Sequence, residues 1–308
     1  MRTQVRRTTT AEAVARALGE RLVTVIDAGG RAVARRTWFR LAPLAVLQGF
    51  EVDAAEYERL VRSSVPGVER YQRALVGAEV GEALVTVTDA GEVLAGEPSP
   101  LVERLGVLRG RETRGGASQR VERVRLDDAL VRAAVEEPVF LRLSAGGREL
   151  DALVGAGSLL GQLLGVEVDV AFSPLLDQQA LFGDLDAVLR AAGLTLWRIG
   201  WPTHGVERHW THLTHSDTAF YGRIPAERAA GSGRLLRARA LYLRDHVDMP
   251  EATPADRLRL AALGALCDAA GEIDMAAACL HRLVDRRGAL DEMARPALTA
   301  HLRQLERE

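Results

Sequence analysis

The chain contains no lysine and no asparagine, so all 40 of its basic residues are arginines. Without lysine it has no residue to form a Schiff base and none to serve as the phosphate-binding lysine of a P-loop. Aldolase-like, pyridoxal-phosphate-dependent and Walker-A chemistry are therefore excluded by residue type. A GC-rich genome accounts for the bias itself, which carries no functional meaning beyond these exclusions.

Cysteine and long apolar runs are scarce as well. Cys267 and Cys279 are the only cysteines and form no CxxC pair, which predicts a reducing compartment and no disulfide framework. No apolar run reaches the roughly 18 residues of a membrane-spanning helix, and the arginines of the first ten residues are not followed by the apolar segment of a secretion signal. We expect a cytoplasmic protein with no membrane partner.

The composition is that of a folded protein with little net charge. Hydrophobic residues make up 47% and charged residues 27% of 308 residues, and the formal net charge is -2. Because no global positive field is present to attract a phosphate backbone, we expect no nucleic-acid partner.

Apolar strand-like runs alternate with helical segments, which predicts an α/β protein with a Rossmann-like sheet. We expect a Rossmann-like domain over residues 1–200, with a surface loop over residues 89–116 whose mobile part extends to residue 120. A connecting segment rich in histidine and tryptophan over residues 201–234 and a wholly helical extension over residues 235–308 follow. The helices of the extension offer a surface for a protein partner or for self-association. The main predicted strands are Arg21–Asp27, Ala45–Glu51, Val139–Leu143, Val166–Phe172 and Thr195–Ile199.

The first two predicted strands end in a pattern typical of a nucleotide cofactor site. Asp27 is followed by Ala28, Gly29 and Gly30, and Glu51 ends the second strand about twenty residues later. Glycine lets the backbone approach a ligand closely, and an acid in this place accepts hydrogen bonds from ribose hydroxyls. The alternatives are that the glycines only form a tight turn and that Glu51 is only a solvent-exposed acid at the end of a strand.

The chain resembles the FkbM-type methyltransferases as a divergent member, over residues 22–199. The resemblance rests on segments that occur in order along the chain: VIDAGG (Val25–Gly30), GFEVDAAEYERL (Gly49–Leu60), RALVGAEVGEA (Arg73–Ala83), VRLDDAL (Val124–Leu130), FLRLSAGGRELDALVGA (Phe140–Ala156) and Val166–Ile199. It implies a seven-stranded methyltransferase sheet that binds S-adenosylmethionine and transfers methyl to an oxygen of a small molecule or sugar. It assigns Asp27, Gly29, Gly30, Glu51 and Asp53 to the cofactor.

The substrate side of the resemblance is altered. Ser144 and Gly146 stand where relatives have acidic residues, and Glu149 is the acid that remains. Since O-methylation requires removal of the hydroxyl proton, two interpretations stay open. The chain is either an enzyme with a replaced base or a pseudoenzyme that keeps the fold as a binding scaffold.

A cluster of histidines supplies candidates for that base. His209 and His212 are predicted catalytic residues beside Glu149. Together with His204 and His215 they form a candidate site for a divalent metal, so a metal-binding protein is a third interpretation of the chain. A polar surface loop is the alternative, because the spacing matches no standard zinc motif. In the same segment Trp201 and Trp210 are predicted to be core residues, with stacking on a ring or sugar as the other interpretation.

Overall fold

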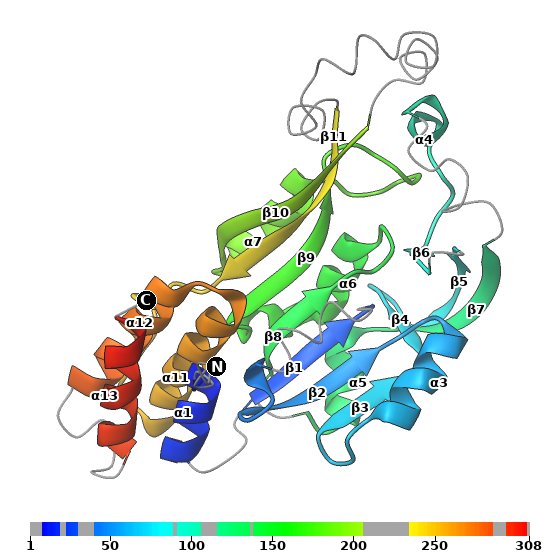
Figure 1. Cartoon of the computed structure of the whole chain (residues 1–308). Coiled ribbons are helices and arrows are strands. Elements are labelled where there is room, and N and C mark those ends of the chain that lie inside the picture. The colour runs from blue at the N-terminus through cyan, green and yellow to red at the C-terminus, as the bar shows by residue number, and fades with distance from the viewer. Residues whose placement is uncertain are drawn as a thin grey trace, which may run out of the picture.

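The computed structural model describes residues 8–18, 23–29, 40–88, 91–105, 116–135, 138–205, 234–285 and 294–306. Its main element is a seven-stranded sheet in the order β10-β11-β9-β8-β1-β2-β3 (Figure 1). Six of these strands run parallel to one another, and β11 is antiparallel to both of its neighbours. The strands are β1 (Val23–Ala28), β2 (Ala45–Phe50), β3 (Glu69–Gln72), β8 (Pro138–Leu143), β9 (Gly165–Ala171), β10 (Thr195–Gly205) and β11 (Arg234–Leu243).

The strand order follows the dinucleotide-binding pattern. Numbered along the chain within this sheet, the strands lie in the order 3-2-1-4-5-7-6, against 3-2-1-4-5-6 for the Rossmann fold. The difference is the antiparallel strand β11, inserted between β9 and β10. The prediction of an α/β protein with a mostly parallel sheet is confirmed, and the arrangement is consistent with a Rossmann-like methyltransferase fold.

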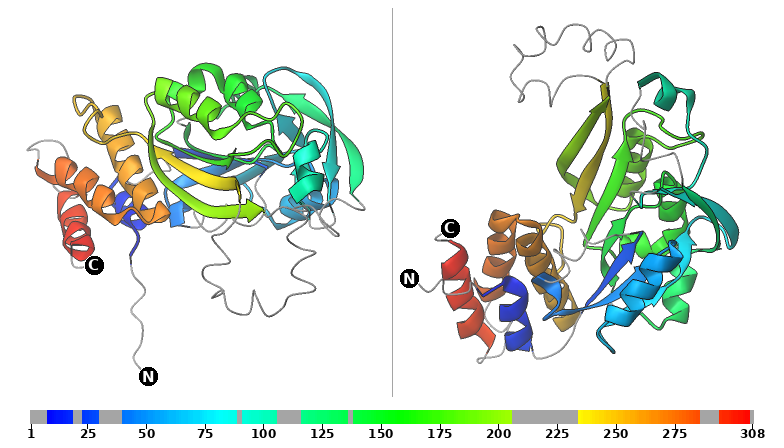
Figure 2. Two further views of the ribbon diagram at one scale, coloured as in Figure 1. Left: turned by 90° about the horizontal axis from the view of Figure 1, so that it is seen from above. Right: turned by 45° about the vertical axis from the view of Figure 1, so that its right-hand side comes forward.

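Helices cover one face of the sheet, and a second group of helices packs against one end of it (Figure 2). On one face, Ile26, Leu141 and Val166 pack with buried residues of α5 (Leu126–Arg132), α6 (Glu149–Ala156) and α7 (Phe182–Ala191). On the other, Val25 and Phe140 pack with buried residues of α1 (Thr10–Leu18) and of the C-terminal helices. Because alternate residues of a strand point to opposite faces, single strands such as β1 and β8 contribute to both cores.

The prediction that the chain is wholly helical from residue 235 is wrong for its first part. Arg234–Leu243 forms β11, and the predicted domain boundary at residue 200 falls inside β10. Leucine, alanine and arginine favour helices intrinsically, but pairing with β9 and β10 on both sides overrides that weak preference. The described residues from 254 onward are helical as predicted and form α11 (Pro254–Ala270), α12 (Ile273–Asp285) and α13 (Ala294–Leu305).

A second sheet lies between β3 and α5 in the chain. It has the order β4-β7-β5-β6, made of β4 (Ala74–Val76), β5 (Gly81–Val87), β6 (Val93–Leu94) and β7 (Ala117–Val124). A helix, α4 (Pro100–Leu105), follows β6. The predicted surface loop is therefore wrong where it covers β6 and α4, and the predicted mobile segment is wrong from residue 117, because β7 pairs with β5 along its whole length.

The C-terminal helices are tied to the rest of the fold by polar contacts as well as by packing. Helix α11 begins with a capping box, in which the side chains of Thr253 and Asp256 each accept a hydrogen bond from the backbone N–H of the other residue. At its other end, buried Asp268 accepts a hydrogen bond from the backbone N–H of Thr10 at 2.8 Å. Among the helices that the structure describes, none is both long and apolar enough to cross a membrane.

Candidate functional site

A cavity of about 570 Å³ opens at the carboxyl ends of β1, β2, β8 and β9. Its walls also include β10, β11 and the segment Gly91–Leu94 of the second sheet. The chain proceeds from β1 to β2 and β3 on one side of the sheet and continues with β8 and β9 on the other side of β1, so the strand order reverses between β1 and β8. Ligands of open α/β sheets bind at this switch point, outside the carboxyl ends of the strands. The cavity therefore lies where the fold favours ligand binding.

Gly29 closes β1 and lines the cavity. Its φ is +82°, and a Cβ atom built on it would lie 2.0 Å from the carbonyl oxygen of Ser144. The two segments are joined by a hydrogen bond of 2.8 Å from the N–H of Ser144 to the oxygen of Ala28. Close approach of the β1 and β8 backbones thus requires this glycine, whatever the ligand. The other predicted glycine, Gly30, lies outside the described residues.

Glu51 follows β2 and lines the cavity at a residue exposure of 2%. Its Oε1 accepts hydrogen bonds from the backbone N–H groups of Val52 at 2.8 Å and Asp53 at 2.9 Å. These two donors fix the carboxylate in one orientation. The structure therefore places the predicted ribose acid beside Gly29 at the mouth of the switch point.

Asp53 has a different position from the other predicted cofactor residues. It is the N-cap of α3 (Ala54–Ser63), where its Oδ1 accepts a hydrogen bond from the N–H of Ala55 at 3.2 Å. Gln119 of β7 donates to the same oxygen at 3.4 Å. Since Asp53 does not line the cavity, its contacts are those of a helix cap, and its cofactor role stays a prediction.

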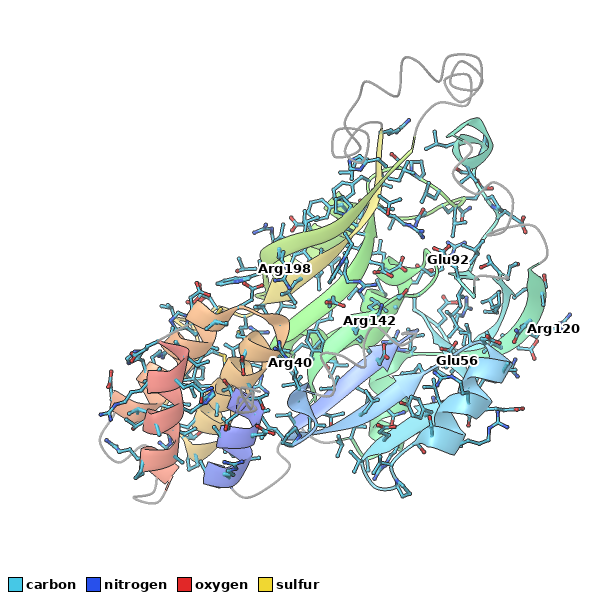
Figure 3. All side chains as sticks on the ribbon, in the orientation of Figure 1. Arg40, Glu56, Glu92, Arg120, Arg142 and Arg198 are labelled. Carbon is cyan, nitrogen blue, oxygen red and sulfur yellow. The ribbon has the colours of Figure 1, made fainter. Side chains whose placement is uncertain are left out.

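A row of charged side chains crosses one face of the sheet, and its central member, Arg142, lines the cavity (labelled in Figure 3). Arg142 of β8, 5% exposed, lies 3.5 Å from Asp27 on one side and 3.5 Å from Glu167 on the other. These three residues are direct partners in the strand register. Burial raises the pKa of Asp27 to about 7, although the guanidinium of Arg142 lowers it. Asp27 itself is not among the residues that line the cavity, although its partner Arg142 is.

The loop after β8 carries the altered motif of the resemblance. Glu149, the first residue of α6, turns back so that its Oε1 accepts hydrogen bonds from the N–H groups of Ala145 at 2.9 Å and Gly147 at 3.1 Å. Burial raises the pKa of Glu149 to about 7; the charge of Asp169 raises it further, and the backbone donors lower it. Glu149 lines the cavity together with Ser144 and Gly146.

Gly146 has no room for a side chain. Its φ is +63°, and a Cβ atom would lie 2.7 Å from the carbonyl oxygen of Val93. The N–H of Ala95 donates to the carbonyl of Gly146 at 2.9 Å, and Arg148 reaches the oxygen of Ala95 at the same distance. The second sheet therefore packs directly on the substrate-side loop and occupies the space that an acidic side chain would need.

Arginines and a tryptophan from β10 and β11 complete the walls. Arg239 binds Asp169 at 3.0 Å through Nε and lies 5.3 Å from the ring centroid of Trp201. Arg237 forms an ion pair with Glu92 of the second sheet. The prediction that Trp201 is a core residue is wrong, because it is 69% exposed on the rim of the cavity.

The predicted histidine site is described only at His204. This residue lies in β10 opposite Leu235 of β11 and is not part of the cavity wall. His209, His212 and His215, together with Trp210, lie outside the described residues. Within the part of the chain that the structure describes, no three histidine, cysteine or acidic side chains are grouped to hold a metal ion.

Sequence reasoning missed Arg142 and Arg239 as members of the site. A signal for them was present, because acidic residues alternate with valine in VEVDV (Val166–Val170) and arginines alternate with small residues in RARA (Arg237–Ala240). Charges at every second residue of buried strands need partners on the neighbouring strands. Which strands are neighbours is a property of the topology, and the pairs followed only from that.

Comparison with known proteins adds little to this geometry. No family model matches the chain, and the search of curated proteins found no match. A SAM-dependent methyltransferase from Anabaena variabilis ATCC 29413 is similar in structure, with a TM-score of 0.31 and 8% sequence identity over 72% of this chain and 77% of that one. A likeness at this level supports no inference about function.

Proposed function

We propose that this chain is a methyltransferase-like protein that binds S-adenosylmethionine and methylates an oxygen of a small molecule or sugar. The observation that carries the proposal is the joining of Glu51 and Glu149 in one cavity at the switch point of the sheet. The first is the acid that the resemblance assigns to the cofactor, and the second is the acid that it leaves on the substrate side. The ordered resemblance to FkbM-type methyltransferases supports the same proposal.

The residues at the ends of β1 and β2 fit the cofactor. Ribose hydroxyls are hydrogen-bond donors, and the carboxylate of Glu51 is held in place by two backbone N–H groups to receive them. Gly29 presents no side chain beside it. The cavity volume of about 570 Å³ lies within the range of roughly 300–1,000 Å³ for small-molecule sites.

Glu149 is the residue that we assign to the acceptor. When bound, S-adenosylmethionine supplies a methyl group on a positively charged sulfur, which an oxygen nucleophile can attack. Glu149 takes the proton of the acceptor hydroxyl. Its pKa of about 7 suits a base that works near neutral pH. The backbone N–H groups of Ala145 and Gly147 both bind Oε1, which fixes the orientation of the carboxylate in the cavity wall.

Titration calorimetry with S-adenosylmethionine tests the cofactor half of the proposal. We expect binding by the wild type and a loss of about 10- to 100-fold in affinity for Glu51→Gln, since the charged acceptor of the ribose hydroxyls is gone. Glu58→Gln is the matched control, because Glu58 is an exposed acid on the adjacent helix. Equal affinity of Glu51→Gln and wild type, or no binding at millimolar concentration, contradicts the proposal.

The same experiment separates an enzyme from a scaffold. Glu149→Gln keeps an oxygen for the two backbone donors and removes the proton acceptor, so we expect it to bind the cofactor as the wild type does. Formation of S-adenosylhomocysteine in the presence of hydroxylated compounds then reports turnover. Cofactor binding by the wild type and by Glu149→Gln without turnover in either of them favours the inactive scaffold.

A further inference from the structure

Trp201 lies in a distorted part of β10. In the pairing of β10 with β11, Gly200 is opposite Arg239 and Thr203 is opposite Arg237, so β10 has one extra residue in this stretch. Trp201 has a φ of +48°, a conformation that costs a bulky residue about 1–3 kcal/mol. A bulge of this kind re-aims a side chain. Here it holds a large aromatic ring, 69% exposed, at the rim of the cavity.

The guanidinium of Arg239 lies against the ring of Trp201 and is itself held by two carboxylates. The guanidinium carbon of Arg239 is 5.3 Å from the ring centroid, and its nitrogens bind Asp169 at 3.0 Å and Glu167 at 3.6 Å. Two carboxylates thus hold the guanidinium while it stacks on the indole. A cation–π contact covers only one face of an aromatic ring. Since most of the Trp201 side chain is exposed, surface remains for a second ring.

The cavity that Trp201 borders has an apolar part as well as charged walls. Val93, Leu94, Leu175 and Leu176 line the apolar part from the second sheet and from the segment after β9. A sugar ring carries hydroxyls around its edge that each need a polar partner, and these four side chains supply none. A flat ring with one or two hydroxyl groups suits this environment better.

We propose that Trp201 is the stacking platform for a hydroxylated aromatic ring of the phenol or catechol class. That this ring is the methyl acceptor, with its hydroxyl near Glu149, rests on the proposed function; binding of the ring to Trp201 does not. The platform also explains why the chain keeps an exposed tryptophan in an unfavourable backbone conformation next to a cavity.

Ligand-observed NMR titration with catechol tests the platform. We expect catechol to bind the wild type and to lose about 3- to 10-fold in affinity for Trp201→Leu, which keeps apolar bulk without an aromatic face. Trp201→Phe retains most of the affinity. Ile199→Ala is the matched control, because Ile199 is an exposed apolar residue of the same strand outside the cavity wall. Methyl glucoside, titrated in parallel, represents the sugar alternative.

The outcomes distinguish this proposal from the proposed function. Catechol affinity that is equal in Trp201→Leu and wild type overturns the platform, and so does preference for the glucoside or absence of catechol binding. Calorimetry with S-adenosylhomocysteine on the same proteins reports the cofactor site, and we expect Trp201→Leu to bind it as the wild type does. Catechol binding that depends on Trp201, without S-adenosylhomocysteine binding, supports the platform and contradicts the methyltransferase.

Discussion

Replacement of Gly29 by alanine tests how the end of β1 is built. Two costs are expected. Alanine in the left-handed region, at a φ of +82°, loses about 1–2 kcal/mol. The added Cβ would also lie 2.0 Å from the Ser144 carbonyl oxygen, and relieving such a collision by moving strands costs about 1–3 kcal/mol more. We therefore expect Gly29→Ala to lower the free energy of unfolding by about 2–5 kcal/mol.

Two other glycines separate these costs. Gly271, the C-cap of α11, has a φ of +89° and open space where a Cβ would be, so Gly271→Ala carries only the backbone cost. Gly155 in α6 is helical, but its Cβ would lie 1.9 Å from the carbonyl oxygen of Gly77. Gly155→Ala therefore carries only the collision, offset by about 1 kcal/mol of helix propensity.

Urea unfolding followed by circular dichroism gives the three free energies. We expect Gly29→Ala to lower the free energy of unfolding the most, and by more than Gly271→Ala does. A loss for Gly29→Ala no larger than that of Gly271→Ala would refute the packing argument. The glycine would then be required for its conformation and for ligand approach, as the sequence pattern first suggested, and not for contact between β1 and β8.

Three further predictions concern ionisation and capping. Burial raises the folded-state pKa of Asp27 to about 7 from an ordinary value near 4. Its contribution to stability is therefore full below about pH 4 and is lost as the pH rises through 7. The free energy of unfolding should fall by a few kcal/mol from pH 5 to pH 7.5 in the wild type and by less in Asp27→Asn. For the proposed methyl transfer, the rate should rise with pH through about 7 as Glu149 ionises, and Glu149→Gln should lower it by about 100-fold or more without this dependence; a wild-type profile retained in the variant contradicts the assignment of the base. Thr253→Ala removes the cap of α11 and should cost about 1 kcal/mol of stability in urea unfolding, whereas no change would show that Pro254 alone sets the start of the helix.

The central elements of the fold could be predicted because their local patterns agree with their environments. Helix Ala54–Ser63 and the start of α11 at Pro254 carry their own capping residues, Asp53 and Thr253, and β1 and β2 are apolar runs buried on both faces. Strand β11 could not be predicted in the same way. Its alanines, leucines and arginines become a strand because β9 and β10 offer paired edges, which is information held in distant segments.

The candidate site divides along the same line. Glu51 could be predicted because its position depends only on the end of one strand and the backbone N–H groups directly after it. Asp53 carries the same spacing signal, and the structure shows it as the N-cap of α3, which is a role that an acid before a helix often has; its cofactor role stays a prediction. Arg142 and Trp201 could not be found from spacing. The role of Arg142 depends on the partners across the sheet, and that of Trp201 depends on a bulge that only the pairing of β10 with β11 reveals.

The loss of acids at the substrate side and the presence of the second sheet are physically connected. At Gly146 a side chain would collide with Val93, and the backbone of this loop is bonded to Ala95. The glycine is therefore what allows β6 to close one wall of the cavity, and an acid at this position would push that wall away. The carboxylate of Glu149 accepts hydrogen bonds from the backbone N–H groups of Ala145 and Gly147 and so stabilises the same turn. The position that keeps its acid is thus the one where a carboxylate also supports the loop, so chemistry at this site has to be sought at Glu149.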